Sequence, residues 1–86
     1  MSNDSDLPPG WRVAEGHHLE KEFRFPDFAQ ALAFVNAIGA VAEVLGHHPD
    51  LELGWGRVRV TTRTHDASAI TEKDYALAAR IEALPR

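Results

Sequence analysis

Residues 26–50 read PDFAQALAFVNAIGAVAEVLGHHPD, and this stretch sets the fold because it predicts one long apolar helix with defined ends. Asp27 is suited to cap the N-terminus of a helix that runs from Phe28 to Leu45. Gly46 can take the left-handed conformation that ends a helix, and Pro49 prevents a further helical turn. The chain must therefore leave the helix on a short loop directly after Gly46.

The predicted helix has little polar surface on any side. One apolar arc comprises Phe28, Leu32, Val35, Ile38, Ala42 and Leu45, widened by Phe34 and Val41. The opposite side carries Ala29, Ala33, Ala37, Ala40 and Val44. Such a helix is usually covered on more than one side, so we expect it to pack on a sheet and against another helix, from this chain or a second subunit. The alternative is an alanine-rich face in contact with water.

Alternating apolar and polar residues on both sides of this helix predict two β-hairpins. The strands are expected at residues 11–14, 17–25, 51–55 and 57–64. Thr71 to Asp74 form a capping-box pattern, which predicts a second helix from Tyr75 to Leu84. This order, β-β-α-β-β-α, predicts an α+β fold with one four-stranded antiparallel sheet and both helices packed on one face.

Length and composition predict one domain in a reducing compartment. The 86 residues carry a net charge of −4 and no cysteine, so a disulfide framework is excluded and phosphate-backbone binding is disfavoured. Residues 1–9 are expected to be a flexible lead, and residues 10–86 a single folded domain. The N-terminus lacks a secretory pattern and no uninterrupted apolar run is expected to span a bilayer, so we expect a cytoplasmic protein without a membrane partner.

Three histidines are the strongest candidates for chemistry. His47 and His48 lie on the predicted helix-exit loop, and His65 follows the last predicted strand. Glu43 lies one turn before His47 on the same helix face, where its carboxylate could hold one imidazole nitrogen. Three hypotheses remain open for these four residues: general acid and base catalysis without a metal, a zinc or iron site, or capping and surface roles.

Two acidic residues near these histidines have simpler explanations. Asp74 is the third helical residue of the capping box and could serve only the backbone of Thr71. Asp50 could be a turn residue. His17 and His18, in the first hairpin, have no partner that the sequence reveals, and no role is assigned to them.

Taken together, these motifs resemble the pterin-4a-carbinolamine dehydratase family from about Trp11 to Leu84. The residues that carry the resemblance are Gly10-Trp11, Phe23-Arg24-Phe25, Phe28, Ala42-Glu43, His47-His48-Pro49-Asp50, Trp55-Gly56-Arg57-Val58, Thr64-His65, Ile70-Thr71-Glu72-Lys73-Asp74 and Leu77-Ala78. A short polar lead precedes Trp11, so the helix that family members usually carry there is expected to be absent.

The resemblance implies dehydration of a 4a-hydroxytetrahydropterin to the quinonoid dihydropterin, as part of tetrahydrobiopterin recycling. It implies His47 and His65 as candidate acids for the leaving hydroxyl, and His48 as a substrate-binding residue that takes the N5 proton. The substrate-binding or orienting residues that it implies are Glu43, Pro49, Asp50 and Asp74. It implies no metal and no cofactor, because the pterin is the substrate.

The same resemblance implies partners and one alternative. Family members form homodimers or homotetramers through sheet edges and the long helix, and the reaction links them to an aromatic amino acid hydroxylase. No direct contact with nucleic acid is expected. Other members are non-catalytic assembly factors or transcriptional coactivators that act through dimerisation. The assembly factors tend to lack the histidine set that this chain retains, which favours the enzyme.

Overall fold

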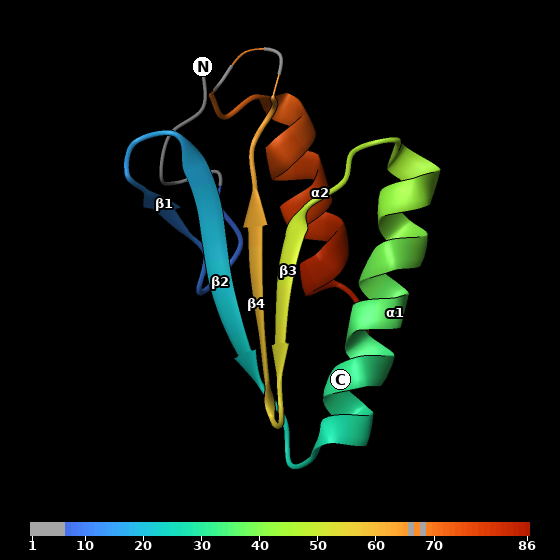
Figure 1. Ribbon diagram of the computed structural model, residues 1–86. Helices are drawn as coiled ribbons and strands as arrows, with labels where there is room; N and C mark the ends of the chain where they lie inside the picture. The colour runs from blue at the N-terminus through green and yellow to red at the C-terminus, as the bar shows by residue number, and fades with distance from the viewer. Residues whose placement is uncertain (1–6, 66, 68) are drawn as a thin grey trace.

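A computed structural model, which describes residues 7–65, 67 and 69–86, shows the predicted order of strands and helices (Figure 1). The elements are β1 (Arg12–Ala14), β2 (His18–Arg24), α1 (Phe28–Leu45), β3 (Asp50–Gly54), β4 (Arg57–Thr62) and α2 (Glu72–Glu82). The prediction of an α+β fold is therefore confirmed. Residues 1–6 of the predicted lead, and Asp66 and Ser68 of the loop after β4, lie outside the described residues.

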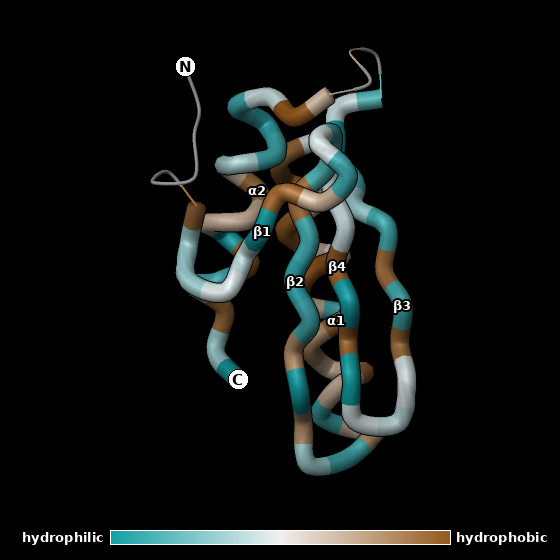
Figure 2. Tube along the Cα trace, turned by 90° about the vertical axis from the view of Figure 1, so that its left-hand side faces the viewer, coloured by the Kyte–Doolittle hydropathy of each residue, from teal (hydrophilic) through white to brown (hydrophobic). Residues whose placement is uncertain are grey.

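The four strands form one antiparallel sheet in the order β1-β2-β4-β3. Figure 2 shows this sheet from the face opposite the helices, with α1 and α2 behind the strands. Alternate residues of β2 and β4 point to opposite faces, and the inward set includes Leu19, Phe23, Val58 and Val60. The outward set is charged, and Glu20, Glu52 and Arg59 form ion pairs across the strands.

The hydrophobic core lies between the sheet and the two helices. Its buried residues are Trp11, Leu19, Phe23, Ala31, Phe34, Ile38, Val41, Val58, Val60, Leu77, Ala78 and Ile81. Phe34 of α1 lies between Phe23 and Phe25, with ring centroids 4.8 and 5.1 Å away. Since burial of a large apolar side chain contributes about 1.5–3 kcal/mol, this layer is the main source of stability.

Helix α1 has its predicted ends, but the buried arc is rotated from the predicted one. Asp27 accepts a hydrogen bond from the backbone N–H of Gln30 at 2.8 Å, which confirms the N-cap. The buried residues of α1 are Ala31, Phe34, Ile38, Val41 and Ala42. Phe28 and Leu32, predicted to belong to the arc, are 44% and 40% exposed. The arc was misplaced because the position of the sheet, rather than helical periodicity alone, selects the buried face.

By length and composition alone, α1 could cross a membrane, contrary to the prediction that no such run exists. Its 18 residues, Phe28–Leu45, have a mean hydropathy of 1.7. In the structure the buried side of this helix packs on β3, β4 and α2, as the core helix of a globular domain does.

Lys21 interrupts the apolar face of β2 without leaving its charge unpaired. Its ammonium group donates to Glu82 Oε1 and to the backbone oxygen of Pro9, both at 2.8 Å. Trp11 Nε1 donates to the same Glu82 oxygen at 2.9 Å. These contacts connect the segment before β1, the central part of β2 and the end of α2.

Candidate functional site

The end of α1 places two histidines on the loop that leads to β3. Gly46 takes the left-handed conformation with φ 66°, as predicted, and its N–H donates to the Ala42 carbonyl. The backbone N–H of His47 donates to the same carbonyl at 3.2 Å. These bonds close the helix, and the loop then turns back towards the end of β4.

A small hollow of about 240 Å³ lies between this loop, the end of β4 and the start of α2. It is lined by Gly46, His47, His48, Thr64, His65 and Lys73. The three histidines singled out in the sequence therefore meet at one hollow, although they come from two separate segments. The volume is below the range of about 300–1,000 Å³ typical of drug-sized ligands, so the hollow suits a small ring.

Asp74 lies behind the hollow and connects the residues around it through hydrogen bonds. This carboxylate is fully buried, at 0% exposure, and accepts four hydrogen bonds. Its Oδ1 accepts from Thr62 Oγ1 at 2.6 Å and from His47 Nε2 at 2.7 Å. Its Oδ2 accepts from Thr64 Oγ1 and from the backbone N–H of Thr71, both at 2.9 Å. The capping box is thus confirmed, and the same carboxylate also reaches His47.

The pKa of Asp74 is lower than its ordinary value, which fixes its protonation state. Burial alone would raise this pKa, but the hydrogen bonds donated by Thr62, His47, Thr71 and Thr64 together outweigh burial. Asp74 is therefore ionised at neutral pH and can only accept hydrogen bonds. It follows that His47 Nε2 carries a proton, so Nδ1 is the nitrogen of His47 that can exchange a proton with a ligand.

Glu43 contacts His48, although it lies one helical turn before His47. The His48 Nε2 atom is 2.5 Å from Glu43 Oε2, and the two side chains are 62% and 77% exposed. Helical spacing ends at Gly46, so the loop brings the second histidine back over Glu43. An exposed contact of this kind adds little stability, and its effect is to orient one imidazole.

The structure does not bring every candidate residue into the hollow. His65 lies on the turn after β4, next to Thr64, and lines the hollow. Among the residues described, Pro49 and Asp50 are not part of its lining. Asp50 is exposed and begins β3, where it pairs with Thr61. These two residues set the direction of the loop.

Sequence reasoning missed three residues at this site. Thr62 and Thr64 hold Asp74, and Lys73 lines the hollow with a cationic side chain. The signal for the threonines was their place on the inward face of a strand, where a buried hydroxyl needs a partner. For Lys73 the signal was weaker, because a lysine in the first turn of a helix is usually a surface residue.

The arrangement supports proton transfer at the free ring nitrogens of His47 and His48. His47 is held by an ionised carboxylate, and His48 is oriented by another. Each of these imidazoles has one nitrogen engaged and a second available, which is the usual arrangement of a general acid or base. In the described part of the chain, the ligand atoms that gather closely enough for a metal ion lie elsewhere, in the β1–β2 hairpin.

The family model and the similar proteins that match this chain carry the same family name. A family model described as "Pterin 4 alpha carbinolamine dehydratase" matches residues 2–84. A protein from Rubrobacter xylanophilus, provisionally named a pterin-4-alpha-carbinolamine dehydratase, is 47% identical over 76 residues, which cover 88% of this chain and 71% of that protein. A protein of the same provisional name from Acidobacterium capsulatum is 46% identical over 76 residues, covering 88% of this chain and 82% of its own.

Two solved structures share the fold. One is a transcriptional coactivator/pterin dehydratase from Brucella melitensis, with a TM-score of 0.82 and 34% identity over 87% of this chain and 81% of its own. The other is a pterin dehydratase-like protein identified as a RuBisCO assembly factor in the alpha-carboxysome, with a TM-score of 0.72 and 33% identity over 86% of this chain and 87% of its own.

Proposed function

The chain belongs to the pterin 4 alpha carbinolamine dehydratase family, and from this premise we propose that it dehydrates 4a-hydroxytetrahydropterin to quinonoid dihydropterin. The single observation that carries the proposal is that His47, His48 and His65 line one hollow. Any one of these histidines alone would be explained equally well as a surface residue.

The reaction is an elimination of water and needs no change of oxidation state. An imidazolium protonates the 4a-hydroxyl, and the C4a–O bond breaks with its electron pair going to the oxygen. The N5–H proton passes to a base, and the nitrogen's electrons form the C4a=N5 double bond. We assign the acid role to His47 or His65 and the base role to His48, which also binds the substrate.

The contacts around His47 support its role as an acid. Because Asp74 is ionised and buried, it holds the His47 ring through Nε2 and leaves Nδ1 available for proton transfer. Glu43 supports His48 in a similar way from the surface side. Positioned proton transfer of this kind contributes about 10²–10⁴-fold, which suffices for a substrate that already loses water slowly unaided.

The proposal is tested with freshly generated carbinolamine, whose dehydration is followed by absorbance. His48→Ala and His65→Ala should each reduce kcat/KM by about 10²-fold or more. His17→Ala is the matched control, because His17 is a half-buried histidine of the β1–β2 turn outside the hollow, and the rate of this variant should be unchanged. Wild type and all variants running at the uncatalysed rate would overturn the proposal.

The cellular setting is part of the proposal. The substrate places the protein after an aromatic amino acid hydroxylase, in the recycling of tetrahydrobiopterin, and we place it in the cytoplasm. We propose a homodimer or homotetramer, which would cover the exposed side of α1 at Phe28, Leu32 and Val44. Sedimentation analysis of the full chain measures the subunit number directly.

A binding role is the second candidate, because the two solved relatives are named as a coactivator/dehydratase and as an assembly factor. The observation that favours it is the exposure of large apolar side chains, with Val44 at 74% and Trp55 at 70%. The dehydration assay separates the two roles, because a binding module would leave the reaction at its uncatalysed rate.

A further inference from the structure

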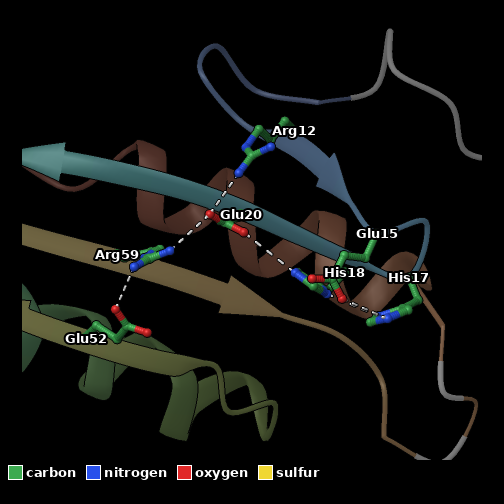
Figure 3. Close-up of polar contacts among 7 residues, drawn as sticks. All are labelled: Arg12, Glu15, His17, His18, Glu20, Glu52 and Arg59. Carbon is green, nitrogen blue, oxygen red and sulfur yellow. Dashed lines mark hydrogen bonds and ion pairs between the residues drawn. The ribbon is translucent and has the colours of Figure 1, made fainter.

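The β1–β2 hairpin holds a second cluster of histidine and glutamate, separate from the proposed catalytic hollow. Glu15, His17 and His18 each offer a ligand atom, and these atoms lie within 4.8 Å of one another. Figure 3 shows the two imidazoles side by side at the turn, with Glu15 next to them. No role could be assigned to these histidines from the sequence, because it reveals no partner for them.

The turn explains how two successive histidines come together. Ala14 pairs with His18, so Glu15, Gly16 and His17 form a three-residue loop, and the N–H of His17 donates to the Ala14 carbonyl at 3.2 Å. Glu15 and Gly16 both have positive φ, of 55° and 76°, which is the pattern of a type I′ turn. His17 is therefore outside the ladder and free to lie over the ring of His18.

The Nδ1 atoms of the two imidazoles lie next to each other. His17 Nδ1 and His18 Nδ1 are 3.1 Å apart. Two nitrogens that bind one metal ion at about 2.0–2.1 Å would be about 2.9 Å apart at a right angle and about 3.3 Å apart at the tetrahedral angle. The observed separation falls between these values, so the pair has the spacing of a chelate.

A carboxylate that is not itself a proposed ligand, Glu20, lies on the far side of the His18 ring and favours this use of its Nδ1. His17 Nε2 lies 3.5 Å from Glu15 Oε1, and His18 Nε2 lies 3.6 Å from Glu20 Oε1. A carboxylate beside Nε2 favours a proton on that nitrogen and leaves a lone pair on Nδ1. Two Nδ1 atoms 3.1 Å apart that both carry a lone pair can share one cation.

The side chains around His18 are largely buried and held by ion pairs. Its side chain is 13% exposed, and that of Glu20 is 15% exposed. Arg12 donates to Glu20 Oε2 at 3.1 Å, and Arg59 lies 3.7 Å from the same oxygen (Figure 3). Glu20 is thus held by two cations and acts as the outer partner of His18, while exposed Glu15 can move to bind the metal.

We propose that Glu15, His17 and His18 form a binding site for a divalent transition metal ion, of the zinc, nickel or copper class. His17 Nδ1 and His18 Nδ1 are the first two ligands, and the Glu15 carboxylate is the third. Two imidazoles with one carboxylate suit these ions, whereas magnesium and calcium prefer oxygen ligands alone. The site is independent of the proposed dehydration.

The test uses the full chain labelled with ¹⁵N and titrated with Zn²⁺ alone at pH 7.5. We expect one ion per chain, with the Nδ1 signals of His17 and His18 shifting in long-range ¹H–¹⁵N spectra. Calorimetry of His17→Ala should show a loss of affinity greater than about 100-fold, and Glu20→Gln a loss of about 10-fold, typical of an outer partner. Mg²⁺ should give no shift.

His48→Ala is the matched control, because His48 is also a histidine next to a glutamate but has no role in the hairpin. It should bind Zn²⁺ with wild-type affinity. The proposal is overturned if Zn²⁺ does not bind, if His17→Ala binds it equally well, or if the shifts appear at His47, His48 and His65 instead. Thermal unfolding of each variant confirms that it is folded before titration.

Discussion

Replacing Thr62 by valine removes one hydroxyl group and keeps the shape of the side chain. In the structure that hydroxyl donates to Asp74 Oδ1 at 2.6 Å, and the two residues are 1% and 0% exposed. A hydrogen bond to a charged group contributes about 1.5–3 kcal/mol, and valine cannot replace it. We therefore expect the free energy of unfolding to fall by about 2 kcal/mol, which corresponds to a decrease in Tm of roughly 8–16 °C.

The control is the neighbouring residue, Thr61, which is half-buried on the other face of β4. Thr61→Val makes the same chemical change away from Asp74, and its effect should stay within about 0.5 kcal/mol. Urea unfolding of both variants and the wild type at pH 7 gives the comparison. Equal stability of the two variants would refute the central place that we give to the Asp74 hydrogen bonds.

The pH dependence of unfolding tests the same hydrogen bond in a second way. Because the folded-state pKa of Asp74 lies below the ordinary value of 3.8, its ionised carboxylate adds stability above about pH 4, which is lost as the pH falls through the folded-state pKa. In Thr62→Val this pKa should move up again. The stability difference between wild type and variant should then be full at neutral pH and shrink in acid. A constant difference down to pH 2 would mean that the hydroxyl does not act through the carboxylate.

Three further substitutions test the packing by urea unfolding. Glu82→Gln should reduce stability by about 1–2 kcal/mol at neutral pH, because Lys21, only 15% exposed, loses its charged partner. Gly56→Ala should reduce it by about 1–3 kcal/mol, since a Cβ there would lie 2.6 Å from the Phe25 carbonyl oxygen. Gly39→Ala should instead raise it by about 0.5–1 kcal/mol, because Gly39 is inside a helix and a Cβ there meets nothing within 4 Å. A loss of stability in Gly39→Ala, or none in Gly56→Ala, would contradict these contacts.

Local signals gave the ends of α1 correctly, whereas α2 spans Glu72–Glu82 rather than the predicted Tyr75 to Leu84, because the residues directly after the Thr71 cap already form its first turn. Asp27 and Gly46 act on the backbone within a few residues of themselves, so the limits of α1 could be predicted to the residue. The capping box at Thr71 and Asp74 is local in the same way. On the buried face of α1, Phe34, Ile38, Val41 and Ala42 belong to the predicted arc. The burial of Ala31 and the exposure of Phe28 and Leu32 could not be predicted, because they depend on where β3, β4 and α2 lie.

The three histidines of the candidate site could be selected from the sequence, but the residues that hold each imidazole could not. His47, His48 and His65 could be selected from residue type and position at the ends of elements, and the structure places them around one hollow. The partners of each imidazole depend on the path of the loop after Gly46. Helical spacing suggested Glu43 beside His47, whereas His47 contacts Asp74, which lies 27 residues later.

The strand order has a consequence for how the chain folds. The central ladder joins β2 to β4, and the pairing of Arg24 with Arg57 encloses α1 and β3 in one long loop. Helix α1 needs only local contacts and a hairpin such as β3–β4 forms in microseconds, but closing the central ladder carries the entropy cost of a long loop. We therefore expect the docking of β2 onto the β3–β4 hairpin to be the slow step of folding, so that substitutions in that ladder slow refolding, measured by stopped flow, more than substitutions in α2 do.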